Sequence, residues 1–382
     1  LTPGDVLILG GGLGGQSAAR VLGRTLQGKR RVVLIEKEKD FSFPPSLLWV
    51  MTGTRSPGSL SRPFAALARH GVEVVRAQVL SVDIGARVVA TSAGAFSFGH
   101  LLIALGAGFS PQSLPGFTEG ALNPYDLEGA IRTRDALKSF KGGKIVVLVS
   151  SLPFRCPAAP YEAAFLAEDY LAKKGIKATV EVHTPEPFPM PSAGPEVGGQ
   201  LRGLLENRGI AFHPGRKAVR IEPEERRIVF EAGEPAGYDL LIGIPPHCPP
   251  RVLAGSGLTN DAGWVTVDSG SLATKAAGVY AVGDAASISV GGGKSLPKAG
   301  VFAHKQAETA ARNILAEIEG QTPLHRFAGH GWCAVETGSG KAGLGSGDFY
   351  AEGGPRVRMR APSRFWHWGK VLFEKWWLWR WF

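Results

Sequence analysis

Asp5-Val-Leu-Ile-Leu-Gly10-Gly-Gly-Leu-Gly-Gly15 is the stretch that decides the fold, an apolar run that ends in a glycine-rich turn. A helical pattern follows from Ser17, and a second apolar run from Val32 leads to Glu36. Glycines let a backbone turn tightly and approach a pyrophosphate at a helix N-terminus, while the carboxylate accepts hydrogen bonds from ribose hydroxyls. Together these parts predict an adenine-dinucleotide site; the alternative is a glycine-rich turn in another kind of α/β protein.

The composition bounds the class of protein. The chain has 382 residues, 44% of them hydrophobic, which is enough for a large core and two or more domains. No apolar run approaches about 18 residues, so a membrane-spanning helix is not expected. The net charge of +10 fits a nucleic acid, an anionic membrane surface or an anionic substrate. Because the basic residues form no long run and no nucleic-acid motif is present, a nucleic-acid partner is not expected.

Three later stretches extend the first pattern. In Phe43-Pro-Pro-Ser-Leu-Leu-Trp-Val50, prolines and aromatic residues predict a rigid loop rather than a helix. The apolar run from Phe98 to Gly106 predicts a buried strand that ends in a glycine turn, after a β-meander over residues 79–98. Gly278-Val-Tyr-Ala-Val-Gly283-Asp284 repeats the order of strand, turn and acid and is expected to lead into a helix, which Asp284 would cap.

A second βαβ pattern begins at Lys144-Ile-Val-Val-Leu-Val149 and has no glycine fingerprint. Between Gly143 and Gly175 the chain contains no glycine, and prolines and larger side chains stand where a backbone would approach a pyrophosphate. A helix is nevertheless expected from Tyr161 to Lys174. The pattern therefore predicts a Rossmann-like scaffold that does not bind NADH.

The chain has three cysteines, Cys156, Cys248 and Cys333, too few for a disulfide framework. Their number and separation predict a redox pair with one bystander; three buried, inert thiols are the alternative. Cys156 lies beside Arg155 at the head of the expected helix, and both a helix N-terminus and a cation lower the pKa of a thiol. Cys156 is therefore predicted to be a reactive thiolate.

Several of these stretches resemble the two-dinucleotide-domain flavoproteins of the glutathione reductase type, namely the glycine turn with Glu36, the strand that ends at Gly106, and Val282-Gly-Asp284. Four more stretches resemble the sulfide-oxidising branch, which contains sulfide:quinone oxidoreductases and the flavoprotein subunit of flavocytochrome c sulfide dehydrogenase. These are Phe154-Arg-Cys156-Pro, Phe43-Pro-Pro-Ser, Leu296-Pro-Lys298 and Gly331-Trp-Cys333. The resemblance covers essentially the whole chain.

The resemblance implies an α/β fold with two Rossmann-like domains of the glutathione reductase type, and the aromatic tail adds a C-terminal membrane-associating segment. The FAD-binding domain would comprise residues 1–108 and 265–320, and the second Rossmann-like domain residues 109–264. Residues 321–382 would hold the late redox cysteine and an amphipathic membrane anchor.

The resemblance implies FAD as the cofactor, and no metal is expected. Lys298 would lie by the pyrimidine side of the flavin and stabilise the negative charge of its reduced form; a solvated surface lysine is the alternative. The residues expected to bind FAD are Gly10, Gly12, Leu13, Gly14, Gly15, Glu36, Lys37, Gly106, Gly283, Asp284 and Lys298.

The resemblance also implies the catalytic roles. Cys333 would meet the flavin and pair with Cys156, which would carry a persulfide or a growing polysulfide during sulfide oxidation. Glu162 would act as acid or base, with a favourable interaction with the helix dipole as the alternative. Cys248 is expected to be a bystander.

One departure from the resemblance leaves the electron acceptor open. Many sulfide:quinone oxidoreductases carry a third functional cysteine shortly before the first strand of the second domain, and residues 121–128 contain none. A quinone is the predicted acceptor, and cytochrome c is the alternative. A type II NADH:quinone oxidoreductase is the remaining possibility.

The tail, Phe365 to Phe382, holds six of the nine tryptophans. At helical spacing, one face carries Phe365, Trp368, Leu372, Trp376 and Trp379, while Trp377 and Trp381 fall on the opposite face. The interspersed basic residues, and those just before the helix, suit anionic lipid; they are Lys370, Lys375, Arg380, Arg356, Arg358, Arg360 and Arg364.

This tail predicts a peripheral membrane protein, with the cytoplasmic face favoured. Tryptophans at headgroup depth would anchor the helix, and the quinone would approach from the membrane side, past Phe302 and Trp332. An interface in a homo-oligomer or with a partner protein is the alternative use of the aromatic surface.

Overall fold

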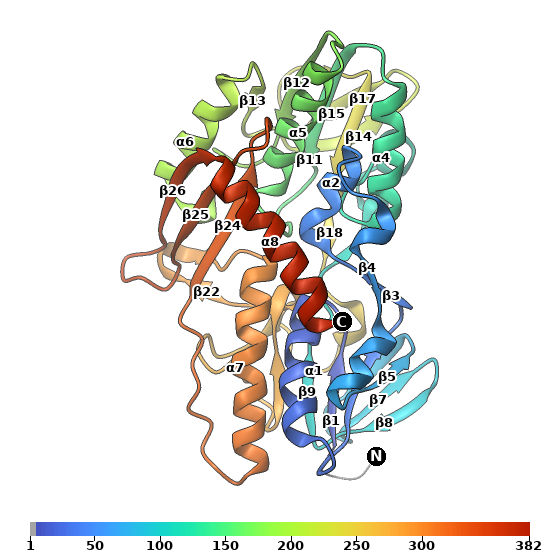
Figure 1. Ribbon diagram of the computed structural model, residues 1–382, viewed down its shortest axis with the longest axis vertical. Helices are drawn as coiled ribbons and strands as arrows, with labels where there is room; N and C mark the ends of the chain where they lie inside the picture. Colours follow the sequence, from blue (N-terminus) through green and yellow to red (C-terminus); the bar gives the residue numbers. More distant parts are fainter. Residues whose placement is uncertain (1–4) are drawn as a thin grey trace.

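The computed structural model describes residues 5–382, so residues 1–4 of the expected FAD-binding segment lie outside the described part of the chain. Two parallel sheets, flanked by helices, and one antiparallel sheet carry the architecture (Figure 1). The α/β fold with two Rossmann-like units is therefore confirmed. Among the residues that the structure describes, no helix is long and apolar enough to cross a membrane.

The first parallel sheet contains the predicted strand–turn–helix–strand unit, in which α1 (Leu13–Leu26) connects β1 to β2. The strand order is β20-β9-β1-β2-β5, the doubly wound order in which ligands bind beyond the carboxyl ends of the strands. The strands are β1 (Val6–Leu9), β2 (Val32–Glu36), β5 (Glu73–Arg76), β9 (His100–Ile103) and β20 (Val279–Ala281).

Alternating side chains of this sheet pack into two hydrophobic clusters, one on each face. Val6 and Ile8 of β1 pack toward α1 and α7 (Gly300–Ile318), while Leu7 and Leu9 pack toward the meander. The meander confirms the prediction for residues 79–98 and consists of β6 (Val79–Asp83), β7 (Val88–Thr91) and β8 (Gly94–Ser97).

The second parallel sheet repeats this plan, with strand order β13-β12-β11-β17. Alternate residues of β11, such as Val147 and Val146, pack on opposite faces of the sheet: one face is covered by helices, the other by a small antiparallel sheet. The parallel strands are β11 (Gly143–Val149), β12 (Ala178–His183), β13 (Ala211–His213) and β17 (Leu240–Ile244). The covering elements are α5 (Ala159–Lys173), α6 (Pro195–Glu206), β14 (Ala218–Glu222), β15 (Arg227–Phe230) and β16 (Ala236–Gly237).

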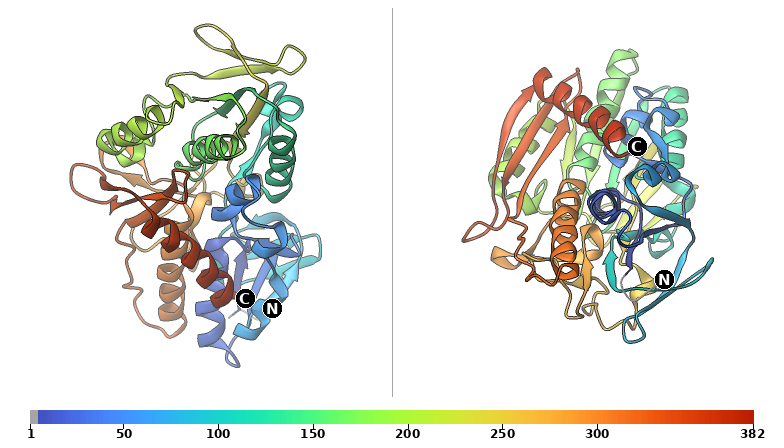
Figure 2. Two further views of the ribbon diagram at one scale, coloured as in Figure 1. Left: turned by 45° about the horizontal axis from the view of Figure 1, so that its top comes forward. Right: turned by 60° about the horizontal axis from the view of Figure 1, so that its bottom comes forward.

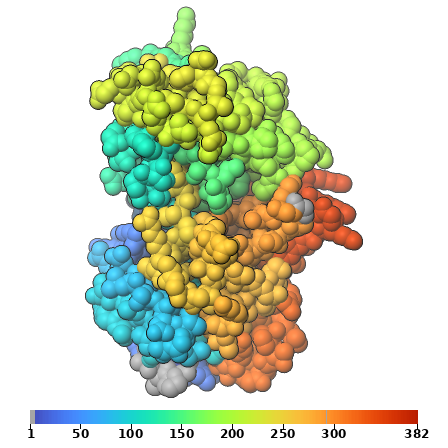
Figure 3. Space-filling model, turned by 180° about the vertical axis from the view of Figure 1, so that it is seen from behind, coloured from blue at the N-terminus to red at the C-terminus, as the bar shows by residue number. Residues whose placement is uncertain are grey.

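The C-terminal part forms an antiparallel sheet and one long helix. The sheet consists of β24 (His330–Glu336), β25 (Ala342–Asp348) and β26 (Arg356–Ser363), and α8 (Arg364–Trp381) follows directly. The helix begins where the Ser363 hydroxyl accepts a hydrogen bond from the Trp366 amide at 3.4 Å. It then crosses the molecule toward α1 (Figures 1 and 2). The opposite face of the molecule, seen in Figure 3, is covered by earlier segments of the chain. The C-terminal segment reaches only the edge of this face.

Shorter elements complete the chain, and two of them correct the sequence analysis. A helix, α2 (Leu47–Met51), stands where a rigid loop is expected, because Pro44 and Pro45 open a turn that the apolar residues continue as a helix. Asp284 caps no α-helix: it lies in a single 3-10 turn, Gly283–Ala285, after which β21 pairs with β19, and α7 begins only at Gly300. The remaining elements are β3 (Asp40–Ser42), β4 (Ser61–Pro63), β10 (Gly108–Phe109), β18 (His247–Cys248), β19 (Val265–Thr266), β21 (Ala286–Ser287), β22 (Ser289–Val290), β23 (Lys294–Ser295), α3 (Phe117–Gly120) and α4 (Leu127–Ser139).

Candidate active site

A cavity of about 310 Å³ lies where the first sheet meets the second Rossmann-like unit. It collects the carboxyl ends of β1, β2, β9 and β20 on one side and the start of α5 on the other. Among its lining residues are nine of the predicted FAD-binding residues: Gly10, Gly12, Leu13, Gly14, Glu36, Gly106, Gly283, Asp284 and Lys298. Cys156 and Glu162 line the same cavity.

The glycine turn fits a dinucleotide. Gly10 has φ +94°, and a Cβ there would lie 2.5 Å from the Ala104 carbonyl oxygen, so only glycine is accommodated. Gly12 borders the cavity, and no atom lies within 4 Å of the position that its Cβ would take, so the backbone is open to a ligand. The Glu36 carboxylate accepts hydrogen bonds from the Gly11 amide at 2.6 Å and the Glu38 amide at 3.0 Å. It is thereby held at the edge of the cavity.

Two predicted FAD-binding residues lie outside the cavity lining. Gly15 packs against the backbone of the glycine turn, since a Cβ there would lie 1.8 Å from the Gly10 carbonyl oxygen. Its absent side chain therefore lets α1 approach β1 closely. Lys37 is exposed and forms an ion pair with Glu38 at 3.7 Å.

Lys298 is a half-buried lysine within the cavity wall. Its ammonium donates to the carbonyl oxygen of Asp284 at 2.6 Å and lies 3.5 Å from the centre of the Trp264 ring. Burial lowers the pKa of Lys298 to about 8 and raises the pKa of the Asp284 carboxyl. These contacts argue against a solvated surface lysine.

Cys156 differs from the predicted activated thiolate. It precedes α5 with φ +54°, and its amide donates to the Lys298 carbonyl oxygen at 2.6 Å. Burial, and then the charge of Glu162, raise the pKa of the Cys156 thiol to about 11. The charge of Lys370, the amide of Ala159 and the charge of Arg155 lower this pKa, but they do not offset the burial. The thiol is therefore protonated at neutral pH in this structure.

Cys333 lies on β24 and faces the same neighbourhood as Cys156. Both pack against one hydrophobic cluster, and burial followed by the charge of Cys156 raises the pKa of the Cys333 thiol. Both thiols are free, so the pairing of the two cysteines stays a prediction. Cys248 is a free thiol in β18, outside the cavity lining, where β18 pairs with β10.

Glu162 has a partner that the sequence analysis did not identify. Lys370 of α8 donates a hydrogen bond to the Glu162 carboxylate, and both side chains are buried. Burial raises the pKa of Glu162 to about 7. Burial acts to lower the pKa of Lys370, but the charges of Glu162 and Glu336 raise it overall, so Lys370 is protonated. The helix-dipole role expected as the alternative for Glu162 is thus accompanied by a specific ion pair.

The two faces of α8 match the predicted division. Phe365, Trp368, Leu372, Trp376 and Trp379 are exposed, whereas Trp377 and Trp381 are buried. The buried face also carries Lys370 and Glu374, which correct the expectation that Lys370 faces lipid. A signal was present in the sequence, since Lys370, Glu374, Trp377 and Trp381 recur at helical spacing.

The predicted quinone residues lie apart from the main cavity. Phe302 is buried on α7, where its ring meets Phe327 and Phe349 edge to face. Trp332 is 38% exposed on β24 and contacts Phe373 of α8. Of the two, Trp332 adjoins the exposed aromatic surface.

The second Rossmann-like unit fills the place of a second pyrophosphate with side chains. Pro160 and the buried Tyr161 occupy the first turn of α5. The Tyr161 hydroxyl donates to the Glu186 carboxylate, which also accepts a hydrogen bond from Thr184 at 3.2 Å, just after β12. This packing agrees with the missing glycine fingerprint.

Comparisons with known proteins agree with this architecture. Residues 4–310 match a family model described as pyridine nucleotide-disulphide oxidoreductase. The chain is 25% identical over 361 residues to the mitochondrial sulfide:quinone oxidoreductase of Mus musculus, covering 91% of this chain and 79% of the relative. It is 24% identical over 353 residues to the mitochondrial sulfide:quinone oxidoreductase of Dictyostelium discoideum, covering 88% and 76%.

Among solved structures, the chain is similar to the sulfide:quinone oxidoreductase from the hyperthermophilic bacterium Aquifex aeolicus. The TM-score is 0.88 at 22% identity, covering 99% of this chain and 91% of that chain. At this level of identity the likeness shows the shared fold.

Proposed function

Because the chain belongs to the pyridine nucleotide-disulphide oxidoreductase family, we propose that it is an FAD-dependent enzyme that oxidises sulfide to polysulfide or sulfur and reduces a quinone. The observation that carries this proposal is the cavity in which Gly12 and Glu36, which suit a dinucleotide, meet Cys156. The sulfide:quinone oxidoreductases similar to this chain support the choice of substrate and acceptor.

The residues around the cavity fit FAD. The glycine turn and Glu36 would hold its adenosine and pyrophosphate, while Gly106, Gly283, Asp284 and Lys298 border the remainder of the cavity. Gly15 would shape the turn from behind, and Lys37 stays a predicted contact. When bound, FAD supplies a two-electron acceptor.

The sulfur chemistry would run through Cys156 and Cys333. In the oxidised pair a disulfide joins them, and hydrosulfide attacks Sγ of Cys156. The disulfide breaks, so that Cys156 carries a persulfide and Cys333 leaves as a thiolate. When the disulfide forms again, two electrons pass to the acceptor, and the additional sulfur atom is released to a further hydrosulfide as polysulfide.

Glu162 would move protons in this reaction. Because burial raises the pKa of both thiols, the reduced cysteines hold protons, and a nearby group must take these up before the disulfide forms again. The Glu162 carboxyl lies near Cys156 and has a pKa of about 7, close to that expected of a general acid or base at neutral pH. Lys370 holds this carboxyl in place from α8.

The proposed location is a membrane surface. The exposed face of α8 presents Trp368, Leu372 and Trp379, which water solvates poorly. Arg356, Arg358 and Arg360 are exposed on the adjoining β26 and suit anionic headgroups. The quinone would approach beside Trp332. The cytoplasmic side and a homo-oligomer stay predictions.

The proposed domain division follows the sequence analysis. Residues 1–108 and 265–320 form the FAD-binding domain, 109–264 the second Rossmann-like domain, and 321–382 the segment with Cys333 and α8. The strand order supports it, because β20 from the later segment joins β9 of the first sheet.

An anaerobic titration tests the proposal. Sulfide, and separately NADH, is added to the purified yellow protein while the flavin absorbance is recorded. We expect bleaching by sulfide alone, reversal by a soluble quinone, and loss of bleaching in Cys156→Ser and in Cys333→Ser, with Cys248→Ser as the matched control. Bleaching by NADH alone would contradict the proposal, and reversal only by cytochrome c would change the acceptor.

A further inference from the structure

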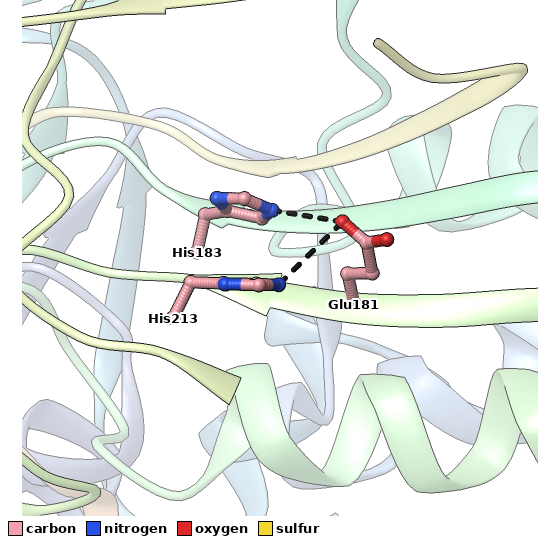
Figure 4. A group of neighbouring side chains, drawn as sticks. All are labelled: Glu181, His183 and His213. Atoms are coloured by element: carbon pink, nitrogen blue, oxygen red, sulfur yellow. Dashed lines mark hydrogen bonds and ion pairs between the residues drawn. The ribbon is translucent and has the colours of Figure 1, made fainter. Parts of the chain in front are cut away.

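Three side chains of the second sheet gather at its edge, away from the cavity. Glu181 and His183 lie on β12, two residues apart, and therefore point to the same face of the sheet. His213 of the edge strand β13 is the register partner of His183, which brings the two imidazole rings together. Figure 4 shows both rings directed at the Glu181 carboxylate.

Three potential metal-ligand atoms, one from each residue, lie close together. Oε2 of Glu181 lies 3.1 Å from Nε2 of His183 and 3.7 Å from Nε2 of His213. The two rings are stacked, with centroids 4.3 Å apart and an angle of 22° between their planes. One potential ligand atom from each residue lies within 4.8 Å of the others.

The surroundings hold this arrangement and leave it accessible. The second oxygen of Glu181 forms an ion pair with Lys144 at 2.8 Å, which leaves Oε2 directed at the imidazoles. The His183 ring is buried and stacks on Phe230 on a further side, so it has little freedom to turn away. The His213 side chain is 42% exposed, so an ion can approach from solvent.

We propose that Glu181, His183 and His213 form a binding site for a divalent transition-metal ion of the zinc type. Two imidazole nitrogens and one carboxylate oxygen form the donor set of a three-ligand zinc site, with water in the remaining position. Magnesium and calcium prefer oxygen ligands, and the positive charges of Lys144 and Arg216 nearby disfavour ions held mainly by charge.

The bound ion would tie the edge strand to the sheet. Ligands from both β12 and β13 join two strands at the boundary of the second unit, so binding stabilises the folded state. No metal is expected from the sequence, where Glu181 and His183 are separated from His213 by about 30 residues. Only the register between β12 and β13 brings the three side chains together. The site is independent of the sulfide chemistry, since none of its residues lines the cavity.

Calorimetric titration of the purified FAD-loaded protein with Zn²⁺ tests this site, with Mg²⁺ as the control ion. We expect one Zn²⁺ per chain, a higher Tm with Zn²⁺, and no binding of Mg²⁺. Glu181→Gln and His213→Ala should each weaken Zn²⁺ binding by a factor of about 100 or more, because loss of a ligand costs at least as much as loss of an outer-shell partner, which costs about 10- to 100-fold. His330→Gln, at an exposed histidine on β24, should leave binding unchanged.

Co²⁺ separates this site from the cysteines. Ligand-field bands without the charge-transfer absorption of a thiolate–cobalt bond support a site of nitrogen and oxygen ligands. Thiolate charge transfer, undiminished Zn²⁺ binding in Glu181→Gln and His213→Ala, or no binding by the unaltered protein would each overturn the proposal. Flavin bleaching by sulfide should be unchanged in His213→Ala, which keeps this test apart from that of the proposed function.

Discussion

Glu162 shows how one residue acquires its chemistry from burial. Its carboxyl lies in the first turn of α5, where the helix dipole favours its ionised form, yet burial raises its pKa to about 7. Lys370 opposes this shift by pairing with the carboxylate. The balance between burial and pairing leaves a group that can exchange a proton near neutral pH, close to Cys156.

Glu162→Gln is predicted to slow sulfide-dependent flavin reduction by about 100-fold, because an amide cannot accept a proton and general acid–base catalysis contributes at least this much. Stopped-flow absorbance across pH measures the effect. At each pH the rate is expressed per hydrosulfide ion, so that ionisation of the substrate does not contribute. This rate should rise with pH through about 7 in the unaltered protein as Glu162 ionises, and the variant should lose the rise.

Glu196→Gln is the matched control, since Glu196 also lies in the first turn of a helix, α6, but is exposed. If Glu162→Gln and Glu196→Gln slowed flavin reduction equally, Glu162 would have only the general role of a carboxylate at a helix N-terminus. A role in proton transfer would then be contradicted.

The burial of His304 should make the free energy of unfolding depend on pH. The His304 ring meets the rings of Trp377 and Trp381 edge to face, and its Nδ1 is 2.8 Å from the Ser17 hydroxyl. Burial lowers the pKa of His304 from 6.5 to about 4. The charges of Lys305 and Arg380 lower this pKa further, while Glu308 raises it. The folded state therefore holds this ring neutral.

As the pH falls from about 6.5 to about 4, the unfolded chain binds a proton at His304 that the folded chain does not, so the free energy of unfolding decreases. The decrease is at most about 3.5 kcal/mol, at about 1.4 kcal/mol per pKa unit. Above neutral pH this effect is absent. Urea midpoints at about pH 7.5 and pH 5 should differ less in His304→Gln than in the unaltered protein. An equal difference would mean that other groups carry the acid sensitivity.

At the scale of the element, α8 separates stability from surface binding. The Trp377 ring stacks on Trp381 with centroids 4.3 Å apart, and its Nε1 lies 3.3 Å from Oε1 of Gln16. Glu374 is fully buried and accepts a hydrogen bond from Arg55 at 3.0 Å. Trp379, on the other face, is 74% exposed.

Trp377→Ala should lower the free energy of unfolding by about 3–5 kcal/mol, as expected for an aromatic side chain lost from a core. Trp379→Ala should change it by less than about 0.5 kcal/mol, because its side chain faces solvent. Urea unfolding measures both. Vesicle co-sedimentation of the folded proteins should give the opposite ranking: Trp379→Ala should bind vesicles more weakly than Trp377→Ala. If both variants lost stability alike, the exposed face would instead be covered by protein.

At the scale of the whole molecule, the net charge of +10 gives the proposed membrane contact an ionic part. The exposed arginines lie on β26, the strand that leads directly into α8, so we expect charge and apolar surface to act together. Binding to anionic vesicles should therefore exceed binding to neutral ones, and should weaken as salt screens the charges.

Flotation with phosphatidylserine-containing and phosphatidylcholine vesicles tests this prediction. We expect binding to the anionic vesicles to fall at about 1 M salt, where the Debye length is about 3 Å. A combined Arg356→Gln and Arg358→Gln variant should show a smaller salt effect. Equal, salt-independent binding to both vesicles would contradict the ionic contribution.

The predictions from the sequence were accurate where the deciding interactions are local. Gly10 needs its positive φ whatever surrounds it, and the two faces of α8 follow from helical spacing. They were wrong where packing decided: Asp284 leads into a strand pair rather than a helix, and the Cys156 thiol is not activated. The charge of Lys370 suggested lipid, but its place on the inner face of α8 directs it to Glu162.

By itself, the sequence determined the α/β class, the first dinucleotide unit and the lack of a glycine cradle in the second. These follow from glycine conformations, strand alternation and residue size, which are properties of short stretches. Only the tertiary structure decided the pKa of Cys156, the partner of Glu162, and the meeting of Glu181 with His213. Burial and contacts between distant residues depend on how the elements pack, and no short stretch contains that information.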